Sequence, residues 1–116
     1  ACAASLAALK LYEDENLFER ANELSKYWED AVHSLKGTRN IIDIRNLGLI
    51  GAVELEPIVG KPTRRAYNVL CEAFNNQKTL LRVTGDIIAL SPPLIISKNE
   101  IDQLIENLKT TLEKTE

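Results

Sequence analysis

The fold of this chain is decided by residues 80–94, which read LLRVTGDIIALSPPL. Two short runs of aliphatic and β-branched residues flank Gly85 and Asp86, and a glycine at the first central position suits a two-residue type II′ turn. The length of this loop sets the register between the two runs. The predicted pairs are Thr84 with Ile87, Val83 with Ile88, Arg82 with Ala89 and Leu81 with Leu90. The stretch therefore predicts an antiparallel β-hairpin in which Asp86 shapes the turn, and whether Asp86 has a further role stays open.

The two faces of this hairpin differ in character. Side chains alternate between faces along a strand, so one face collects only apolar residues, namely Leu81, Val83, Ile88 and Leu90. The opposite face carries Arg82 with the small Ala89 across from it, which leaves the guanidinium room to move. An arginine placed in this way is suited to bind a carboxylate or phosphate through its planar fork. An outward arginine that is only solvated or ion-paired fits the same pattern, and both interpretations stay open.

The totals describe a single globular domain of ordinary composition. The chain has 116 residues, of which 45% are hydrophobic and 27% charged, and a formal net charge of −3. A weakly acidic chain with scattered basic residues lacks the electrostatic pattern of a nucleic-acid-binding protein. No apolar run is long enough to cross a bilayer, and no signal-peptide pattern opens the chain. We therefore expect a cytoplasmic protein with neither nucleic acid nor membrane as a partner.

The first residues already have helical composition. The chain begins at Ala1 without Met, and an Ala-rich helix is predicted from there to about Glu13, packed closely against another surface. Such a start is typical of a domain cut from a longer protein, although a processed terminus gives the same pattern. Cys2 and Cys71 are too few and too far apart for a disulfide framework or a zinc site, so buried free thiols are expected.

A second helix is predicted over residues 17–35. Asn16 and Glu19 stand at capping-box spacing before it, and Gly37 is a natural stop. Its apolar residues recur at helical spacing: Leu17, Ala21, Leu24, Trp28, Ala31, Val32 and Leu35. His33, the only histidine, lies beside this stripe without metal-ligating neighbours, so it is predicted to lie at the surface.

Two further helices are predicted downstream. One begins at Pro62 or Thr63 and ends at Asn75-Asn76. Its expected apolar side consists of Ala66, Tyr67, Leu70, Cys71 and Phe74. The last helix begins at a capping box formed by Ser97 and Glu100. Its apolar stripe is Ile101, Leu104, Ile105, Leu108 and Leu112.

Two more strands complete the expected sheet. Residues 41–45 and 49–55 read as strands joined by a turn at residues 46–48. Gly48 and Gly51 lack the spacing of a phosphate-binding loop, so a turn and a bulge explain them better. Pro92 and Pro93 close the last strand, because proline donates no hydrogen bond to a ladder. The fold class is therefore α+β, with a small antiparallel or mixed sheet of about four strands and helices packed mainly on one face.

Three stretches together resemble a known family. They are residues 43–55 (DIRNLGLIGAVEL), residues 81–86 (LRVTGD) and residues 89–96 (ALSPPLII). The chain resembles the C-terminal small domain of class III aminotransferases that use pyridoxal phosphate, a domain of the fold type I kind, specifically the omega-amino acid–pyruvate (beta-alanine–pyruvate) branch. The resemblance extends over residues 1–116 as one domain, with residues 1–15 as the end of a connecting helix.

The resemblance implies a role for one residue and the absence of others. In such enzymes the arginine at the position of Arg82 binds the substrate carboxylate and swings aside for an uncharged amine. The Schiff-base lysine, the aspartate at the pyridine nitrogen and the phosphate cup belong to a larger upstream domain. We therefore expect that this chain alone neither binds pyridoxal 5′-phosphate nor transaminates, and that the complete enzyme is a cytoplasmic homodimer acting on an amino acid or amine and pyruvate.

A second hypothesis comes from a different functional class. The chain could be a stand-alone regulatory module that binds a small carboxylate through Arg82; a fully solvated first helix and acid binding at Arg82 would favour it. A domain separated from its neighbour also exposes the surface that met it, which favours self-association through the first helix or the Arg82 face. The preferred amino donor does not follow from these residues, because the residues that would select it are largely absent here.

Overall fold

The computed structural model describes residues 1–116 and contains four helices and four strands. The helices are α1 (Cys2–Asp14), α2 (Leu17–His33), α3 (Arg64–Asn76) and α4 (Lys98–Lys114). The strands are β1 (Ile41–Leu47), β2 (Ile50–Leu55), β3 (Arg82–Thr84) and β4 (Ile87–Leu90). The predicted α+β class is confirmed. None of the helices is long and apolar enough to cross a membrane.

The strands form one sheet in the order β1-β2-β4-β3, and every neighbouring pair is antiparallel. The predicted hairpin register is confirmed for three of the four pairs, since Arg82 pairs with Ala89, Val83 with Ile88 and Thr84 with Ile87. The predicted pair of Leu81 with Leu90 is not part of the ladder, because β3 begins at Arg82. Gly85 has a φ of 63°, and only the first central residue of the turn is left-handed, as a type II′ turn requires. Strand β4 ends at Leu90, before the two prolines.

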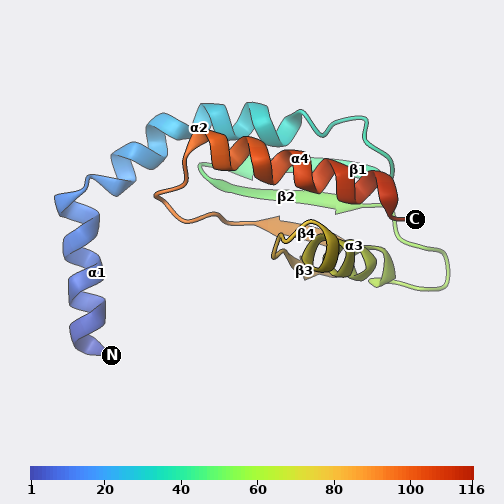
Figure 1. Cartoon of the computed structure of the whole chain (residues 1–116), viewed down its shortest axis with the longest axis horizontal. Helices are drawn as coiled ribbons and strands as arrows, with labels where there is room; N and C mark the ends of the chain where they lie inside the picture. The colour runs from blue at the N-terminus through green and yellow to red at the C-terminus, as the bar shows by residue number, and fades with distance from the viewer.

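The core lies between one face of the sheet and helices α2, α3 and α4 (Figure 1). Alternate residues of the central strands are fully buried on this face: Val53, Leu55, Ile88 and Leu90. They meet the apolar stripes of the helices, whose largest buried member is Trp28. No helix covers the other face, and Leu47 and Ile50 on that face are therefore 80% and 59% exposed. The sheet is therefore covered on one side only, as predicted.

The turn between β1 and β2 differs from the prediction. Leu47 pairs with Ile50, so the loop consists of Gly48 and Leu49 rather than residues 46–48. Gly48 has a φ of 55°, which a glycine adopts without strain and which lets both strands continue to the turn. The predicted bulge at Gly51 is also wrong, since the register shift lies between Ile41 and Asp43. Gly51 instead accommodates Trp28, whose Cζ2 would lie 3.4 Å from an added Cβ.

Two helix details also differ from the prediction. Asn16 precedes α2 with a left-handed φ of 49° and makes no side-chain cap, so the capping box with Glu19 does not form. Helix α3 buries Ala66, Val69 and Ala73. Tyr67 and Phe74, which were expected on its buried side, are exposed. Small alanines let α3 approach the core closely. The helix therefore buries the face that contains Ala66 and Ala73, and the face with Tyr67 and Phe74 is left exposed. The capping box of Ser97 and Glu100 on α4 is confirmed.

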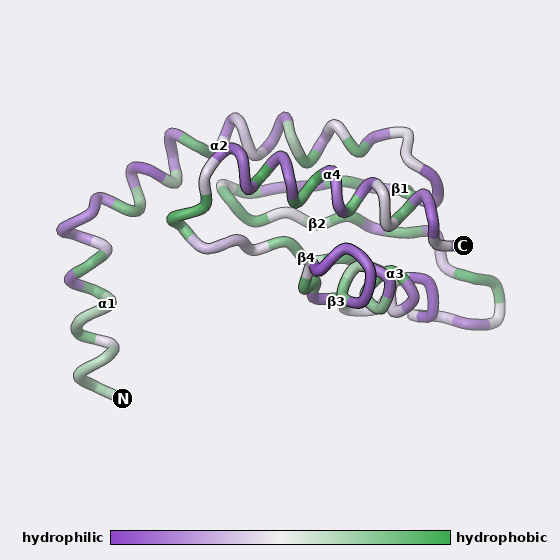
Figure 2. The backbone as a smooth tube through the Cα atoms, in the orientation of Figure 1, coloured by the Kyte–Doolittle hydropathy of each residue, from purple (hydrophilic) through white to green (hydrophobic).

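Helix α1 extends away from the rest of the molecule (Figure 1). It contains no buried residue, and Figure 2 shows hydrophobic residues recurring around it, among them the exposed Leu6, Leu9 and Leu11. Both cysteines are free, but Cys2 is exposed and Cys71 half-buried, so the expected burial of the thiols is wrong.

Candidate functional site

Arg82 lies on the sheet face that no helix covers. Its partner across the hairpin, Ala89, is on the same face, while the neighbouring Val83 and Ile88 point to the core. The Arg82 side chain is exposed and makes no hydrogen bond or ion pair within the chain. The fold therefore places a free guanidinium group on a paired strand beside a small residue, as the sequence predicted.

Arg82 ends a row of four residues that crosses the whole sheet. Directly paired positions connect Arg45 to Ala52, Ala52 to Ala89 and Ala89 to Arg82. Strands lie about 4.8 Å apart, so the Cα atoms of the two arginines are separated by roughly 14 Å. We call the two alanines between them the alanine floor. Ala89 was predicted to face Arg82, but the second alanine, Ala52, joins the row only through the pairing of β2 with β4.

The two arginines of this row differ in their electrostatic surroundings. Arg45 Nη1 donates to Glu54 Oε2 at 2.8 Å and to Asp43. Hydrogen bonds to Glu54 and, to a lesser degree, to Asp43 raise the pKa of Arg45 above its ordinary value. These two carboxylates of the chain also neutralise the charge of Arg45. Arg82 has no such carboxylate. Of the two, Arg82 is the one whose charge is available to an anion from outside the chain.

A hollow of about 470 Å³ opens beside Arg82. Ala89, Ser91 and Pro92 line it from β4 and the chain that follows, and Leu104 of α4 lines it from the side of the core. The prolines have fixed φ angles, so this wall has little conformational freedom. The hollow is thus mostly apolar, with Arg82 and the Ser91 hydroxyl as its polar groups, a composition typical of a site for a small organic acid.

Arg20 of α2 holds the connection that follows the hollow. Its guanidinium donates to the carbonyl oxygens of Leu94, Ile95 and Ile96, the last at 2.7 Å. One rigid, planar donor group satisfies three backbone acceptors that belong to no helix or strand. This contact fixes the path from Pro93 to α4. The contact was not predicted, because no local sequence pattern links residues 20 and 94.

Asp86 does more than shape the hairpin turn. Its Oδ2 accepts a hydrogen bond from the backbone N–H of Thr63 at 2.7 Å, and its Oδ1 accepts one from Ala66 at 3.2 Å. Both donors lie at the start of α3, which has no side-chain cap of its own. Asp86 therefore caps α3 from the hairpin. The sequence predicts only the turn role of Asp86 and leaves a further role open.

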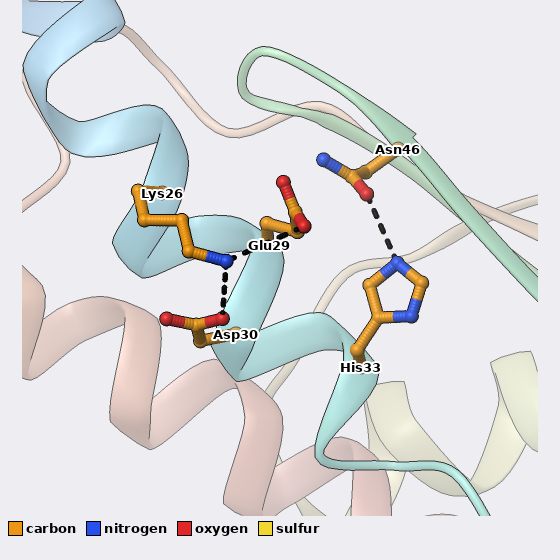
Figure 3. A network of polar contacts seen from close by, with 5 residues as sticks. All are labelled: Lys26, Glu29, Asp30, His33 and Asn46. Carbon is orange, nitrogen blue, oxygen red and sulfur yellow. Dashed lines mark hydrogen bonds and ion pairs between the residues drawn. The ribbon is translucent and has the colours of Figure 1, made fainter.

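His33 lies at the surface as predicted, away from Arg82. Its Nε2 donates to Asn46 Oδ1 at 3.0 Å, which connects the end of α2 to β1 (Figure 3). Within the two preceding turns of the same helix, Lys26 pairs with Glu29 and Asp30. The chain contains no group of three or more His, Cys, Asp and Glu side chains that could hold a metal ion. These polar contacts support the fold and form no reactive cluster.

The residues of this chain do not by themselves fit a cofactor that is held through a lysine. All eight lysines are exposed, and none lines the hollow beside Arg82. A lysine that forms a Schiff base requires a partly desolvated position that lowers its pKa. The only charged side chain at the hollow is that of Arg82. The hollow can therefore bind an acid group, but it offers no amine for covalent chemistry.

Comparison with known proteins gives one consistent result. Residues 1–112 match the family described as Aminotransferase class-III. The omega-aminotransferase of Caulobacter vibrioides is 52% identical over 112 residues, which are 97% of this chain and 25% of that protein. The beta-alanine–pyruvate aminotransferase of Pseudomonas aeruginosa is 37% identical over 91% of this chain and 23% of its own length. The chain thus spans about a quarter of these relatives.

Solved structures show the same fold. A thermostable omega transaminase mutant from Pseudomonas jessenii has a TM-score of 0.83 and 26% identity, over 90% of this chain and 24% of the other. The adenosylmethionine-8-amino-7-oxononanoate aminotransferase of Methanocaldococcus jannaschii also has a TM-score of 0.83, with 27% identity over 98% of this chain and 27% of its own. The arrangement of helices and strands is therefore one that occurs within larger transaminases.

Proposed function

This chain belongs to the class III aminotransferases, and we propose that it is the C-terminal small domain of an enzyme that moves an amino group from an omega-amino acid or amine to pyruvate. Two observations support this proposal. The relatives from Caulobacter vibrioides and Pseudomonas aeruginosa are named for omega-amino and beta-alanine–pyruvate transfer. The chain matches about a quarter of their length, which is the size of a single domain within them.

Arg82 is proposed to bind the substrate carboxylate. The observation that carries this role is an exposed guanidinium on a paired strand, without any carboxylate of the chain to neutralise it. A bidentate pair between arginine and a carboxylate supplies both charge and direction, because two parallel N–H groups meet two oxygens. Arg82 thereby orients the amino or keto acid, and the prolines beyond Ser91 keep the apolar wall of the hollow in place.

The alanine floor accounts for the acceptance of uncharged donors. An arginine side chain that is not bound to a carboxylate needs another position, and Ala89 and Ala52 leave space for it to lie across the sheet. An apolar donor then occupies the hollow without facing an unpaired charge. The same site therefore serves amino acids with a carboxylate and amines without one.

The cofactor of the family is proposed to be held by the remainder of the enzyme. Pyridoxal phosphate supplies the electron sink of transamination when it is bound. The exposed lysines of this chain do not form its site, so binding and covalent chemistry belong to the larger domain. That this chain alone does not bind the cofactor stays a prediction. Its own contribution is the binding and orientation of the acid group.

The uncovered surfaces fit contact with that larger domain. Helix α1 is apolar on most sides and yet contains no buried residue, whereas helices of this kind are buried in complete proteins. Leu47 and Ile50 on the open sheet face are exposed as well. We propose that these surfaces pack against the cofactor domain in a cytoplasmic homodimer. Alone, the chain is predicted to self-associate through them.

The test of this function compares two donors that differ only in their acid group. Beta-alanine and propylamine are offered to the full-length enzyme with the uncharged acceptor butanal, so that only the donor carries a carboxylate. Replacing Arg82 by Ala should lower kcat/KM for beta-alanine about 10- to 100-fold, the usual value of a charge-assisted hydrogen-bond pair. The value for propylamine should stay within about twofold. An equal fall for both donors would refute the role of Arg82.

The alternative function is a free-standing module that senses a small carboxylate through Arg82. One observation bears on it: helix α1 contains no buried residue, and a solvated first helix would favour this alternative. The apolar character of α1 argues against permanent exposure, however, and the family match covers α1 as well. Thermal unfolding of the chain with beta-alanine or propanoate separates the two. A rise in melting temperature that Arg82→Ala removes would favour the module.

A further inference from the structure

We propose that Asp86 is a positioning residue for Arg82: by capping α3 from the hairpin turn, it fixes the strand that carries the arginine. The inference rests on the proposed carboxylate-binding role of Arg82. Asp86 itself points to the start of α3, so it acts on the substrate only through the hairpin. The two residues are separated by Val83, Thr84 and Gly85 alone.

The sheet holds β3 only weakly. Strand β3 has three residues, lies at the edge of the sheet and pairs only with β4. Short edge strands without a second neighbour open easily, because few ladder hydrogen bonds oppose the motion. Since Arg82 is the first residue of β3 and exposed, its position depends on what else holds the hairpin.

A set of contacts lies at the other end of β3. Two backbone N–H groups, of Thr63 and Ala66, donate to the two carboxylate oxygens of Asp86. The backbone carbonyl of the same residue accepts a hydrogen bond from Leu55 at 2.8 Å. One residue thus connects the hairpin turn to the end of β2 and to the start of α3. A negative charge at a helix N-terminus is also stabilised by the helix dipole.

These contacts require an aspartate. Helix α3 begins after Thr63, which has a left-handed φ of 68° and caps nothing with its side chain. The free N–H groups of the first turn therefore depend on an acceptor from elsewhere. A carboxylate accepts with both oxygens, whereas an amide accepts with one and carries no charge. The residue at position 86 is therefore expected to hold the hairpin against α3 best when it is Asp, less well when it is Asn and least well when it is Ala.

The readout is the carboxylate preference of the full-length enzyme, defined as kcat/KM for beta-alanine divided by kcat/KM for propylamine, with butanal as acceptor. A displaced Arg82 binds the acid group poorly but leaves propylamine unaffected. Asp86→Ala should therefore lower the preference about tenfold, and Asp86→Asn should lie in between. In an Arg82→Ala background, Asp86→Ala should cause no further fall, because the group that it positions is gone.

The matched control is Asp102→Asn. Asp102 accepts a 2.6 Å hydrogen bond from Tyr27 and so connects α4 to α2, away from β3. The control loses a carboxylate contact of similar length, and its carboxylate preference should stay at the wild-type value. If Asp102→Asn lowers the preference as much as Asp86→Asn does, general destabilisation explains the effect and the inference is overturned.

The two proposals fail in distinguishable ways. If Arg82→Ala leaves the carboxylate preference unchanged, the proposed role of Arg82 fails and takes this inference with it. If Arg82→Ala abolishes the preference while Asp86→Ala and Asp86→Asn keep it, only the inference fails. Should both Asp86 variants fail to fold, hydrogen exchange of the wild-type enzyme decides. The Thr63 and Ala66 amides should open together with the ladder amides of β3, and faster exchange at Thr63 and Ala66 would overturn the inference.

Discussion

Arg82 and Ala89 face each other directly across β3 and β4, on the side of the sheet that no helix covers. Facing side chains of an antiparallel pair lie within contact distance, so the size of one limits the positions of the other. The methyl group of Ala89 leaves the space above β4 open to the arginine. A substitution at position 89 can therefore restrict the movement of the Arg82 side chain without removing its charge.

Replacing Ala89 by Leu should impair uncharged donors more than acids. The larger side chain occupies the space into which Arg82 is proposed to move, so the guanidinium stays near the hollow. We expect kcat/KM of the full-length enzyme for propylamine to fall about fivefold, and that for beta-alanine to change less than about twofold. Ala52→Leu, one strand farther along the row, should have a smaller effect in the same direction. A selective loss of beta-alanine turnover would contradict the proposal.

Gly51 and Trp28 give a prediction about stability. An added Cβ at Gly51 would lie 3.4 Å from Trp28 Cζ2 and 3.6 Å from Leu90 Cβ, which is ordinary contact. Gly51→Ala should therefore change the free energy of unfolding by less than about 1 kcal/mol, whereas Gly51→Val overpacks the site and should cost about 1–3 kcal/mol. Urea unfolding measures both. Ala52→Val adds bulk on the open face as the control, and an equal loss there would refute the role of Trp28.

Arg20 should prove more important than its place on α2 suggests. Lysine has a single ammonium group instead of a planar guanidinium, so it cannot donate hydrogen bonds to all three carbonyl oxygens of residues 94–96. Arg20→Lys should therefore lower the free energy of unfolding by about 1–2 kcal/mol, in the range of hydrogen bonds to charged groups. Urea unfolding is again the measurement. Lys26→Ala removes a surface ion pair of the same helix and should cause no measurable change.

Sequence reasoning succeeded where local chemistry decides the structure. The hairpin register follows from Gly85 at a turn position, and the start of α4 follows from Ser97 and Glu100 at capping-box spacing. In both cases the residues that carry the signal are also the residues that make the contact. The covered and uncovered faces of the sheet follow in the same way from alternation along β4.

Predictions from the sequence were wrong where a segment has several possible local structures and tertiary packing selects one of them. Two helical stripes are available on α3, and the larger side chains of Tyr67 and Phe74 favoured the wrong one. The buried stripe contains Ala66 and Ala73, which permit the closest approach of the helix to the core. Asn16 illustrates a different limit. It has a left-handed φ of 49° and makes no side-chain cap on α2, and sequence spacing does not reveal this angle.

The same distinction between local contacts and tertiary contacts applies to the candidate site. Arg82 and Ala89 are neighbours through a two-residue turn, so the sequence placed them together correctly. Ala52 joins them through the pairing of β2 with β4, and the start of α3 reaches Asp86 through tertiary structure. The arrangement around Arg82 could therefore be predicted only as far as the hairpin itself extends. Its role in substrate binding stays a prediction that the donor comparison tests.

Glu100 gives a prediction about pH. Its Oε2 accepts hydrogen bonds from the backbone N–H of Ser97 at 2.7 Å and from the Ser97 hydroxyl at 2.8 Å, and these lower the pKa of Glu100 below its ordinary value of 4.5. A lowered native pKa stabilises the fold above about pH 4.5, and this stabilisation is lost as the pH falls through the native pKa. In urea titrations between about pH 6 and 3, the wild-type chain should therefore lose stability more steeply than Glu100→Gln. Glu106→Gln, on the same helix but without a hydrogen bond, should follow the wild type, and a Glu100→Gln curve parallel to both would show that the capping box contributes nothing to the pH dependence.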